Sequence, residues 1–477
     1  MQMTRRASLL TISAALAAPA LLHSRAAFAA EGRALALPRL DEGTLDNGLR
    51  RFDLAIAAGQ SEFFAGQITD TVGINAPFLG PVLRAKAGDR VRFNVANGLA
   101  EATALHWHGL HLPAAMDGGP HQPIAPGTIW SPEFPLLQKA GTFWFHAHQH
   151  GMTAAHVWAG MAGVLRIEDD EEAALPLPRT YGEDDFTLIL QDRRFTADFR
   201  MPYAPDMHDR MSGTIGDVML VNGQIGAHLP TSAPRIRLRI VNGANGSAYR
   251  LHLADGQVFH QIASDGGLLP APLPLTEALM APGERAEYLL DLQDGNPRML
   301  RAEVFGAESP FAGSNGVRDV IEIRPARAQP PAAALPARLA DLPAVPDQTG
   351  DARHFALAMT GQGLMGDFTI NDARFDHGRI DFSVPLGASE TWTFENKTEM
   401  LHPMHIHDVQ FRILARNGQP PEPREAGLKD VVLTRPGERV DLRLSFTDYA
   451  DPATPYMMHC HILEHEDAGM MQQFTVI

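Results

Sequence analysis

The 21 histidines of this 477-residue chain include four His-x-His pairs, and one pair encloses the only cysteine. On a β-strand, residues two apart point to the same face, so each pair presents two imidazoles together. The enclosed cysteine must then face the opposite side of its strand. Two metal sites can therefore lie back to back across one short stretch of backbone. The pairs are His106 and His108, His146 and His148, His405 and His407, and His459 and His461.

The second of these sites forms around Cys460. His402 precedes the third pair by three residues, and His465 and Met470 follow the cysteine by five and ten. Two histidines, a cysteine and a weak methionine ligand describe a blue-copper electron-transfer centre. Zinc is the competing metal, but structural zinc sites favour several thiolates and this chain has one.

Other histidines stand alone. A single strand histidine is usually a hydrogen-bonded surface or core residue, whereas four pairs in register point to metal ligation. We expect the hydrogen-bonded role for His111, His121, His150, His156, His252 and His260.

Short apolar, β-branched runs alternate with Gly, Pro, Asn and Asp clusters along most of the chain, which predicts an all-β fold. Two markers recur about every 150 residues in one phase. A strand ends at Asn97, Asn242 and Asn396, and a Pro-Gly turn follows at Pro126, Pro282 and Pro436. We therefore predict three tandem β-sandwich domains at 45–170, 180–326 and 348–477, joined by linkers near 168–180 and 326–347.

The repeat also locates the chemistry. Nine and eleven residues beyond the repeat asparagine, the first and third units carry the histidines of a pair. The middle unit has Leu251 and Leu253 there. We expect the metals to lie in the first and third domains, with a middle domain that has no ligands.

Residues 1–30 are typical of an export signal. Arg5 and Arg6 precede an apolar stretch that ends in small residues suited to cleavage. The twin arginine indicates the export machinery that carries folded proteins across the inner membrane. A membrane anchor is the alternative, but an apolar run broken by Pro19 and His23 is too short to span comfortably. We therefore expect a periplasmic protein.

Composition and charge limit the possible binding partners and the sources of stability. A net charge of −16 argues against nucleic acids and anionic membrane surfaces, which both need basic patches. One cysteine cannot form an internal disulfide, so stability must come from the hydrophobic cores. We expect a monomer.

The segments LHWHGL, FWFHAHQHG, HPMHIH and HCHILEHEDAGMM resemble the four copper-binding motifs of multicopper oxidases, and the resemblance extends from about residue 45 to the end. It is closest to bacterial exported cuprous oxidases and laccase-like enzymes. It implies cupredoxin-like Greek-key sandwiches and four copper ions: one type 1, one type 2 and a type 3 pair. The implied type 1 ligands are His402, Cys460, His465 and Met470, the type 2 ligands His106 and His405, and the type 3 ligands His108, His146, His148, His407, His459 and His461.

The resemblance also implies an activity, in which a reductant loses single electrons at type 1 copper and dioxygen takes four electrons to become water. The family's acidic residues near the cluster match Asp117 and Glu466, for which we expect proton delivery. The alternatives for these two carboxylates are a turn residue and a solvated charge.

The sequence defines the reductant less well than it defines the metal ligands. Metal-oxidising relatives carry a methionine-rich insert over the type 1 site, whereas the corresponding region here has only Met359 and Met365. Thr398 stands where cuprous oxidases of this type carry an aspartate. We therefore expect an open type 1 site that oxidises phenols or aromatic amines, with copper(I) oxidation as the alternative. The methionines from Met201 to Met219 could dock copper(I), or could simply fill gaps in a loop.

Two other classes of protein compete with an oxidase. Some exported relatives keep the three sandwiches, have lost the ligands and act as copper-free scaffolds, but all twelve expected ligands are present here. Electron-transfer and nitrite-reducing cupredoxins lack four complete His-x-His motifs.

Overall fold

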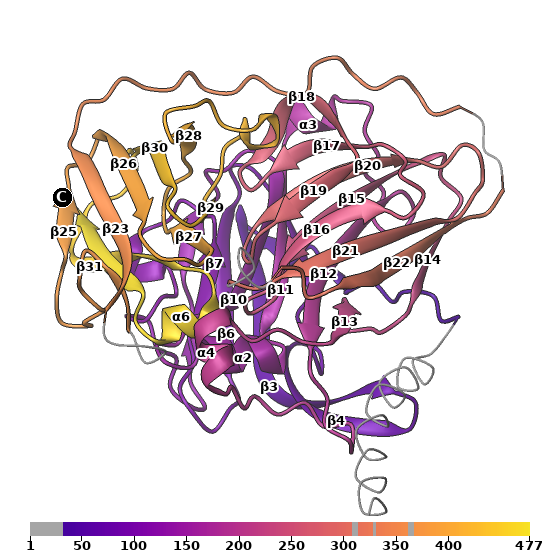
Figure 1. Cartoon of the computed structure of the whole chain (residues 1–477), viewed down its shortest axis with the longest axis horizontal. Coiled ribbons are helices and arrows are strands. Elements are labelled where there is room, and N and C mark those ends of the chain that lie inside the picture. The colour runs from indigo at the N-terminus through magenta and orange to yellow at the C-terminus, as the bar shows by residue number, and fades with distance from the viewer. Residues whose placement is uncertain (1–31, 308–312, 328–330, 361–366) are drawn as a thin grey trace, which may run out of the picture.

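The computed structural model describes residues 32–307, 313–327, 331–360 and 367–477. The expected signal at 1–30 and Met365 lie outside these residues. Strands dominate the described chain and form paired sheets in three sandwiches arranged around a common centre (Figure 1). The prediction of an all-β fold of three tandem cupredoxin-like sandwiches is confirmed. The domain limits given above remain a proposal.

In the first sandwich, one sheet has the order β1-β5-β11-β10-β7 and the other β2-β3-β6-β8, with β4 on β3 and β9 on β6. Alternate residues of β6 are buried, as expected for a strand with one face on a core. Its strands are β1 (Leu40–Asp41), β2 (Thr44–Asp46), β3 (Leu49–Phe64), β4 (Gln67–Ile74), β5 (Val82–Lys86), β6 (Arg90–Asn97), β7 (Leu105–His108), β8 (Ile129–Trp130), β9 (Glu133–Pro135), β10 (Gly141–Ala147) and β11 (Ala162–Glu168).

In the second sandwich, the sheets have the orders β13-β12-β15-β20-β17-β18 and β14-β22-β21-β16-β19. Leu251 and Leu253 are buried in its core, in the positions that hold histidines in the other units. Its strands are β12 (Asp185–Arg193), β13 (Val218–Val221), β14 (His228–Thr231), β15 (Arg235–Asn242), β16 (Ala248–Leu253), β17 (Phe259–Ser264), β18 (Gly267–Leu275), β19 (Glu277–Met280), β20 (Arg285–Asp291), β21 (Arg298–Phe305) and β22 (Val317–Pro325).

In the third sandwich, the sheets have the orders β24-β23-β26-β30-β28 and β25-β32-β31-β27-β29. The described part of the segment that precedes it, residues 331–351, crosses the top of the molecule in Figure 1 without a helix or strand. Its strands are β23 (Ala352–Thr360), β24 (Asp367–Ile370), β25 (Phe382–Val384), β26 (Ser389–Asn396), β27 (His402–Ile406), β28 (Arg412–Arg416), β29 (Val431–Thr434), β30 (Arg439–Ser445), β31 (Asp451–Cys460) and β32 (Met471–Val476).

Short helices lie between the sandwiches. Helix α6 packs against both α2 and α4, so segments from all three sandwiches meet beside the C-terminal histidines (Figure 1). None of the helices in the described part of the chain is long and apolar enough to cross a membrane. The helices are η1 (Ala114–Met116), α2 (Thr153–Ala159), α3 (Asp170–Ala173), α4 (Met207–Ser212), η3 (Pro423–Glu425) and α6 (Leu463–Asp467).

The two repeat markers contact each other in every unit. The backbone carbonyl of each repeat asparagine accepts a hydrogen bond from the glycine N–H of the Pro-Gly turn, at 2.8 Å from Gly127, 3.0 Å from Gly283 and 2.9 Å from Gly437. The asparagine side chain is buried and donates to two backbone carbonyls. Buried backbone groups need such partners, which explains why the two markers share one phase.

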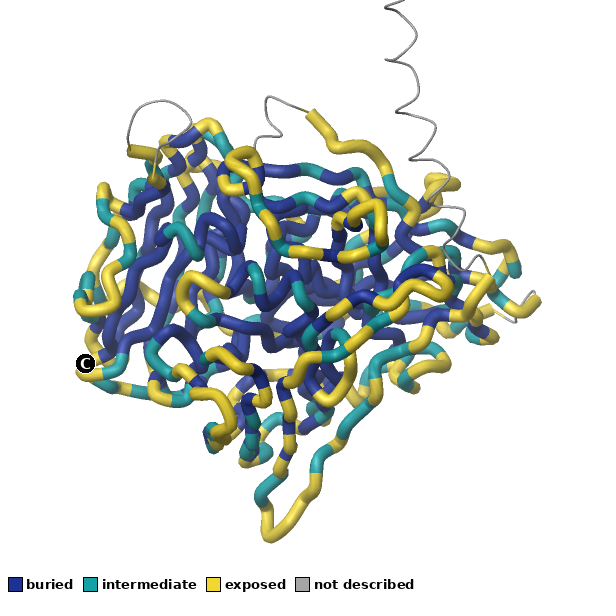
Figure 2. The backbone as a smooth tube through the Cα atoms, turned by 90° about the horizontal axis from the view of Figure 1, so that it is seen from below, coloured by how far each residue is buried: buried dark blue, intermediate teal, exposed yellow. Residues whose placement is uncertain are grey.

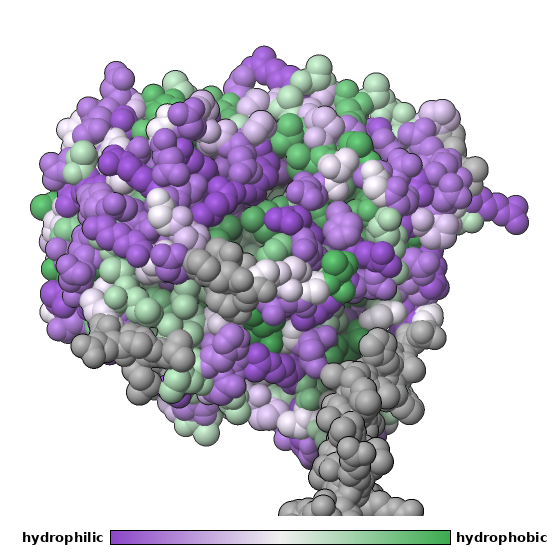
Figure 3. Space-filling view, in the orientation of Figure 1, coloured by the Kyte–Doolittle hydropathy of each residue, from purple (hydrophilic) through white to green (hydrophobic). Residues whose placement is uncertain are grey.

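Buried residues run continuously through the interior of the three sandwiches, and exposed residues lie mainly at their edges and in loops (Figure 2). On the face drawn in Figure 3, hydrophilic residues dominate the outer parts and hydrophobic residues gather near the middle. The predicted ligands lie in this buried interior, where three sandwiches can supply groups to one site.

Candidate metal centres

The first centre lies inside the third sandwich around Cys460. Its Sγ atom lies 3.6 Å from Nδ1 of His402 and 3.6 Å from Nδ1 of His465, and all three side chains are buried. Pairing of β31 with β27 places Cys460 opposite Met404, two residues from His402 on the same strand, and helix α6 supplies His465. Met470 is fully buried in the same core, and its carbonyl accepts a hydrogen bond from the backbone N–H of Cys460 at 3.0 Å.

The second centre contains the four His-x-His pairs and lies between the first and third sandwiches. Within the first, His106 on β7 lies opposite His146 on β10, and within the third, His405 on β27 lies opposite His459 on β31. The ring nitrogens gather in three groups. These groups are His106 with His405 and His407, His108 with His146 and His461, and His148 with His407 and His459.

Hydrogen bonds fix most of these imidazoles with one nitrogen turned toward the cluster. Nδ1 of His106 donates to the carbonyl of Asp117 at 3.0 Å, and its Nε2 lies 3.4 Å from Nε2 of His405. Nε2 of His459 likewise lies 3.2 Å from that of His148 and 3.1 Å from that of His407. Two imidazole nitrogens that face each other at this distance can share a metal ion as ligands.

The donors fit copper in two respects. His461 is fully buried, yet neither of its ring nitrogens has a hydrogen-bond partner in the described residues. Buried polar atoms are normally satisfied, so an unpartnered imidazole within a cluster of imidazoles fits a metal ligand. The set of imidazoles, one thiol and one thioether matches the ligands that copper prefers.

Burial also sets the protonation of the ligands. It lowers the pKa of His465 to about 4 and that of His459 to about 3, so both imidazoles are neutral and can ligate at pH 7. Burial raises the pKa of the Cys460 thiol, which therefore stays protonated without a metal. Metal binding at this thiol must release a proton.

Two buried carboxylates contact the outer nitrogens of the cluster. Oδ2 of Asp117 lies 2.6 Å from Nδ1 of His407. Oε1 of Glu466 lies 3.5 Å from Nδ1 of His148, and its Oε2 lies 3.2 Å from Nδ1 of His459. Burial raises the pKa of Glu466 well above its ordinary value. Neither carboxylate is a solvated charge.

Asp430 is a third such carboxylate, which we did not predict from the sequence. Its Oδ1 lies 3.0 Å from Nε2 of His108, and its backbone carbonyl accepts from Nδ1 of His405 at 2.8 Å. An aspartate just before an apolar strand carries no distinctive signal, so the pattern could not have revealed it.

The single histidines are outside these groups. Within the described residues, none of the six belongs to a set of metal-capable side chains. His156, for example, contacts the hydroxyl of Thr103 at 3.1 Å. The six are His111, His121, His150, His156, His252 and His260.

The histidines proposed for the type 1 site, His402 and His465, are more enclosed than we expected. Both rings are fully buried. Nε2 of His465 donates to the carbonyl of Met211 on α4 at 2.8 Å, and Nε2 of His402 lies 2.8 Å from the hydroxyl of Thr398. A helix of the second sandwich thus covers a site that lacks the methionine-rich insert.

The methionines of the Met201–Met219 segment do not gather at one place. Met201, Met211 and Met219 are buried in three different hydrophobic clusters, while Met207 is exposed. This placement fits the gap-filling alternative better than a shared copper(I) site.

Known proteins of similar sequence and fold identify the family. Profiles described as multicopper oxidase match residues 56–172 and 345–477. The multicopper oxidase mco of Staphylococcus aureus is 35% identical over 441 residues, which cover 92% of this chain and 91% of that protein. The laccase-like multicopper oxidase CueO of Ochrobactrum sp. has a TM-score of 0.84 and 35% identity, over 93% of this chain and 100% of that one. This chain belongs to the multicopper oxidase family.

A differently named relative is also similar over most of the chain. The cell division protein FtsP of Xenorhabdus nematophila is 34% identical over 433 residues, which cover 89% of this chain and 88% of that protein.

Proposed function

We propose that the protein is a copper-dependent oxidase that takes single electrons from a small reductant and passes them to dioxygen. The observation that carries this proposal is the adjacency of two complete ligand sets. Cys460 belongs to one set, and the imidazoles of His459 and His461 on either side of it belong to the other. Copper ions held by these residues would supply the one-electron oxidation and the four-electron reduction of dioxygen to water.

The proposed ligands form two sets. His402, Cys460 and His465 would hold a single ion, with Met470 as the candidate weak ligand. The eight paired histidines would hold the remaining three ions. The covalent path from the thiol to the cluster is one residue long, which suits single-electron transfer between the sites.

Asp117 and Glu466 are the proposed proton carriers. Dioxygen reduction to water consumes protons, and imidazoles that hold copper ions would not supply them. Glu466 has a raised pKa and can hold a proton beside His148 and His459. Asp117 contacts the outer nitrogen of His407 and is the second candidate.

A phenol or an aromatic amine is the proposed reductant. The proposed type 1 histidines are buried, but the outer nitrogen of His402 lies only one residue from the surface. Thr398 is 8% exposed and its neighbour Glu399 is exposed. An electron donor bound at this surface would be one hydrogen bond from His402. The CueO of Ochrobactrum sp. has oxidase activity towards lignin model compounds, which supports this class of substrate.

Copper(I) oxidation is the second candidate. Glu399 and the half-buried Met400 lie beside Thr398 and could bind a copper(I) ion.

We propose the periplasm as the location and the twin-arginine machinery as the export partner, on the basis of residues 1–30. The similarity to FtsP keeps a role in cell division as an alternative.

Oxygen uptake tests the proposal. Copper-loaded protein is offered 2,6-dimethoxyphenol and copper(I) separately. We expect uptake with the phenol without surplus copper, and no intense visible absorption or uptake in Cys460→Ser. Uptake with copper(I) alone would favour the cuprous oxidase. Wild-type protein that binds no copper, or binds it and consumes no oxygen, would favour a structural role.

A further inference from the structure

A buried ion pair joins the second sandwich to the third beside the histidine cluster. Arg285 begins β20, Asp430 immediately precedes β29, and neither side chain has exposed surface. Nη1 and Nη2 of the arginine each lie 2.5 Å from one carboxylate oxygen of Asp430. A two-point contact of this kind fixes the orientation of the carboxylate as well as its charge.

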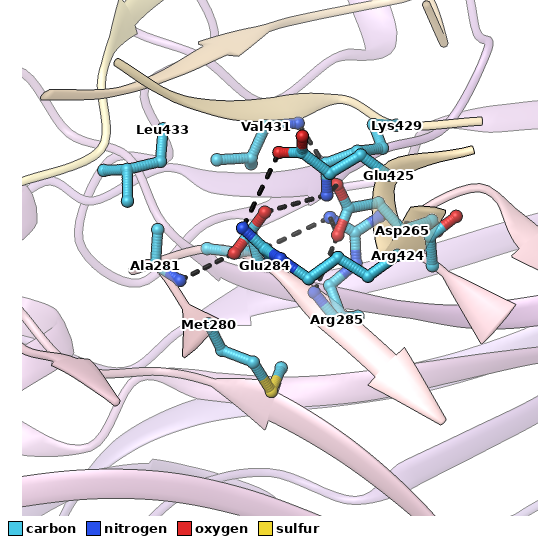
Figure 4. A network of polar contacts seen from close by, with 12 residues as sticks. Asp265, Met280, Ala281, Glu284, Arg285, Arg424, Glu425, Lys429, Val431 and Leu433 are labelled. Atoms are coloured by element: carbon cyan, nitrogen blue, oxygen red, sulfur yellow. Dashed lines mark hydrogen bonds and ion pairs between the residues drawn. The ribbon is translucent and has the colours of Figure 1, made fainter. Parts of the chain in front are cut away.

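Further polar contacts hold Arg285. Its Nη2 donates to the carbonyl of Asp265 at 3.0 Å, and its Nε donates to the carbonyl of Thr142 in the first sandwich at 3.2 Å. Lys429 bridges Asp265 at 2.7 Å and Glu284 at 2.8 Å. Figure 4 shows these groups converging, with Asp265, Glu284 and Arg285 from the second sandwich and Lys429 from the third. All three sandwiches thus take part in holding the guanidinium.

The carboxylate of Asp430 sets the tautomer of His108. A carboxylate only accepts hydrogen bonds, so the His108 Nε2 that faces it at 3.0 Å must carry the proton. The lone pair is then on Nδ1, which lies 3.3 Å from Nε2 of His146. This orientation is reversed in the neighbouring ligands. Five of them donate to an oxygen atom, or face one, through Nδ1 and leave Nε2 for the cluster. These five are His106, His146, His405, His407 and His459.

A glycine next to His108 leaves space for the Arg285–Asp430 ion pair. Gly109 follows His108 with φ +90°, a conformation that favours glycine. A Cβ there would lie 2.5 Å from Oδ2 of Asp430 and 2.6 Å from Nη2 of Arg285. The backbone after the ligand therefore lies directly against the ion pair.

We propose that Asp430 and Arg285 are positioning residues for copper. The pair holds His108 with Nδ1 as its donor atom, and it makes the second sandwich, which supplies no ligand, a determinant of metal loading in the cluster. The pair would act on an ion held by His108, His146 and His461 and would leave the Cys460 centre untouched. This inference rests on the proposed copper function.

The test compares Asp430→Asn and Arg285→Lys with Lys429→Gln in the full chain. Asparagine keeps the shape of aspartate without its charge, and lysine keeps the charge of arginine without its two-point contact. Lys429→Gln is a matched change in the same network, because Lys429 touches no proposed ligand. The measurements are copper bound per chain against a competing chelator, visible absorption, and the copper detected by electron paramagnetic resonance.

Loss of a ligand-orienting contact typically weakens metal binding about 10- to 100-fold. We expect that loss for one cluster copper in Asp430→Asn and a smaller one in Arg285→Lys, with extra paramagnetic copper from a broken type 3 pair. The visible absorption of the Cys460 centre should be unchanged, and Lys429→Gln should load like wild type. If Asp430→Asn fails to fold, Arg285→Lys decides.

Wild-type loading in both Asp430→Asn and Arg285→Lys would overturn the inference. Equal loss in Lys429→Gln would also overturn it, because the effect would then come from the interface in general. Absence of copper in the wild-type protein would instead refute the proposed function, so the two failures are distinguishable.

Discussion

Replacing Thr398 with valine should damage the type 1 centre through one hydroxyl group. The Thr398 hydroxyl donates to Oδ1 of Asn396 at 2.8 Å. It accepts from Nε2 of His402 at 2.8 Å and from the backbone N–H of Met400 at 3.1 Å. Valine has nearly the same shape and none of these hydrogen bonds.

The structure sets the size of the effect. Nε2 of His402 is fully buried and would lose its partner, and a buried unsatisfied donor costs about 1–3 kcal/mol. Met400 is only half-buried, so its N–H can recover water, and Asn396 keeps its bond from the N–H of Thr398 at 2.9 Å. We therefore expect Thr398→Val to lower the free energy of unfolding by about 2–3 kcal/mol.

Thr398→Ser is the matched control, because serine keeps the hydroxyl and removes one methyl group. Burying a methyl group is worth about 0.8 kcal/mol, so the serine variant should lose about that much or less. Denaturant unfolding of the metal-free variants measures the difference. In the copper-loaded forms, the visible absorption should shift in the valine variant and remain in the serine variant. Equal stability of the two, or equal spectra, would refute the assigned role of the hydroxyl.

Three more results are expected. Gly283→Ala would place a Cβ 2.8 Å from the ring of His461, whereas a Cβ at Gly127 in the equivalent turn would meet nothing within 4 Å. Gly283→Ala should therefore reduce copper loading and Gly127→Ala should not. Equal copper loading of the two variants would contradict this. Asp117→Asn should slow oxygen reduction about 10- to 100-fold while leaving reduction of the type 1 copper intact, which stopped-flow absorption can separate. In metal-free protein, nine ligand histidines have lowered pKa values, against four buried acids with raised values. Below about pH 6.5 the unfolded chain therefore binds more protons than the folded chain. The free energy of unfolding should fall by about 2 kcal/mol or more between about pH 6.5 and pH 5. A free energy of unfolding that does not change over this range would contradict the prediction.

The sequence alone indicated the proposed ligands and their division into two sites. Side chains alternate along a strand, so Cys460 and the histidines beside it had to face opposite ways, whatever the rest of the fold. The repeat asparagines and Pro-Gly turns were equally readable, because each pair satisfies the same backbone groups in every sandwich. These features are local or periodic, and both kinds leave a pattern in one sequence.

Only the tertiary structure decided what surrounds the sites. The absence of a methionine-rich insert suggested an open type 1 site, yet α4 brings the carbonyl of Met211 to His465 across 254 residues of sequence. Arg285 likewise meets Asp430 across 145 residues. Such contacts depend on how the second sandwich docks against the other two, and docking places side chains together without any spacing or period in the chain. The pattern of the strands therefore indicates the proposed ligands. The residues that cover and orient these ligands depend on how the sandwiches pack together.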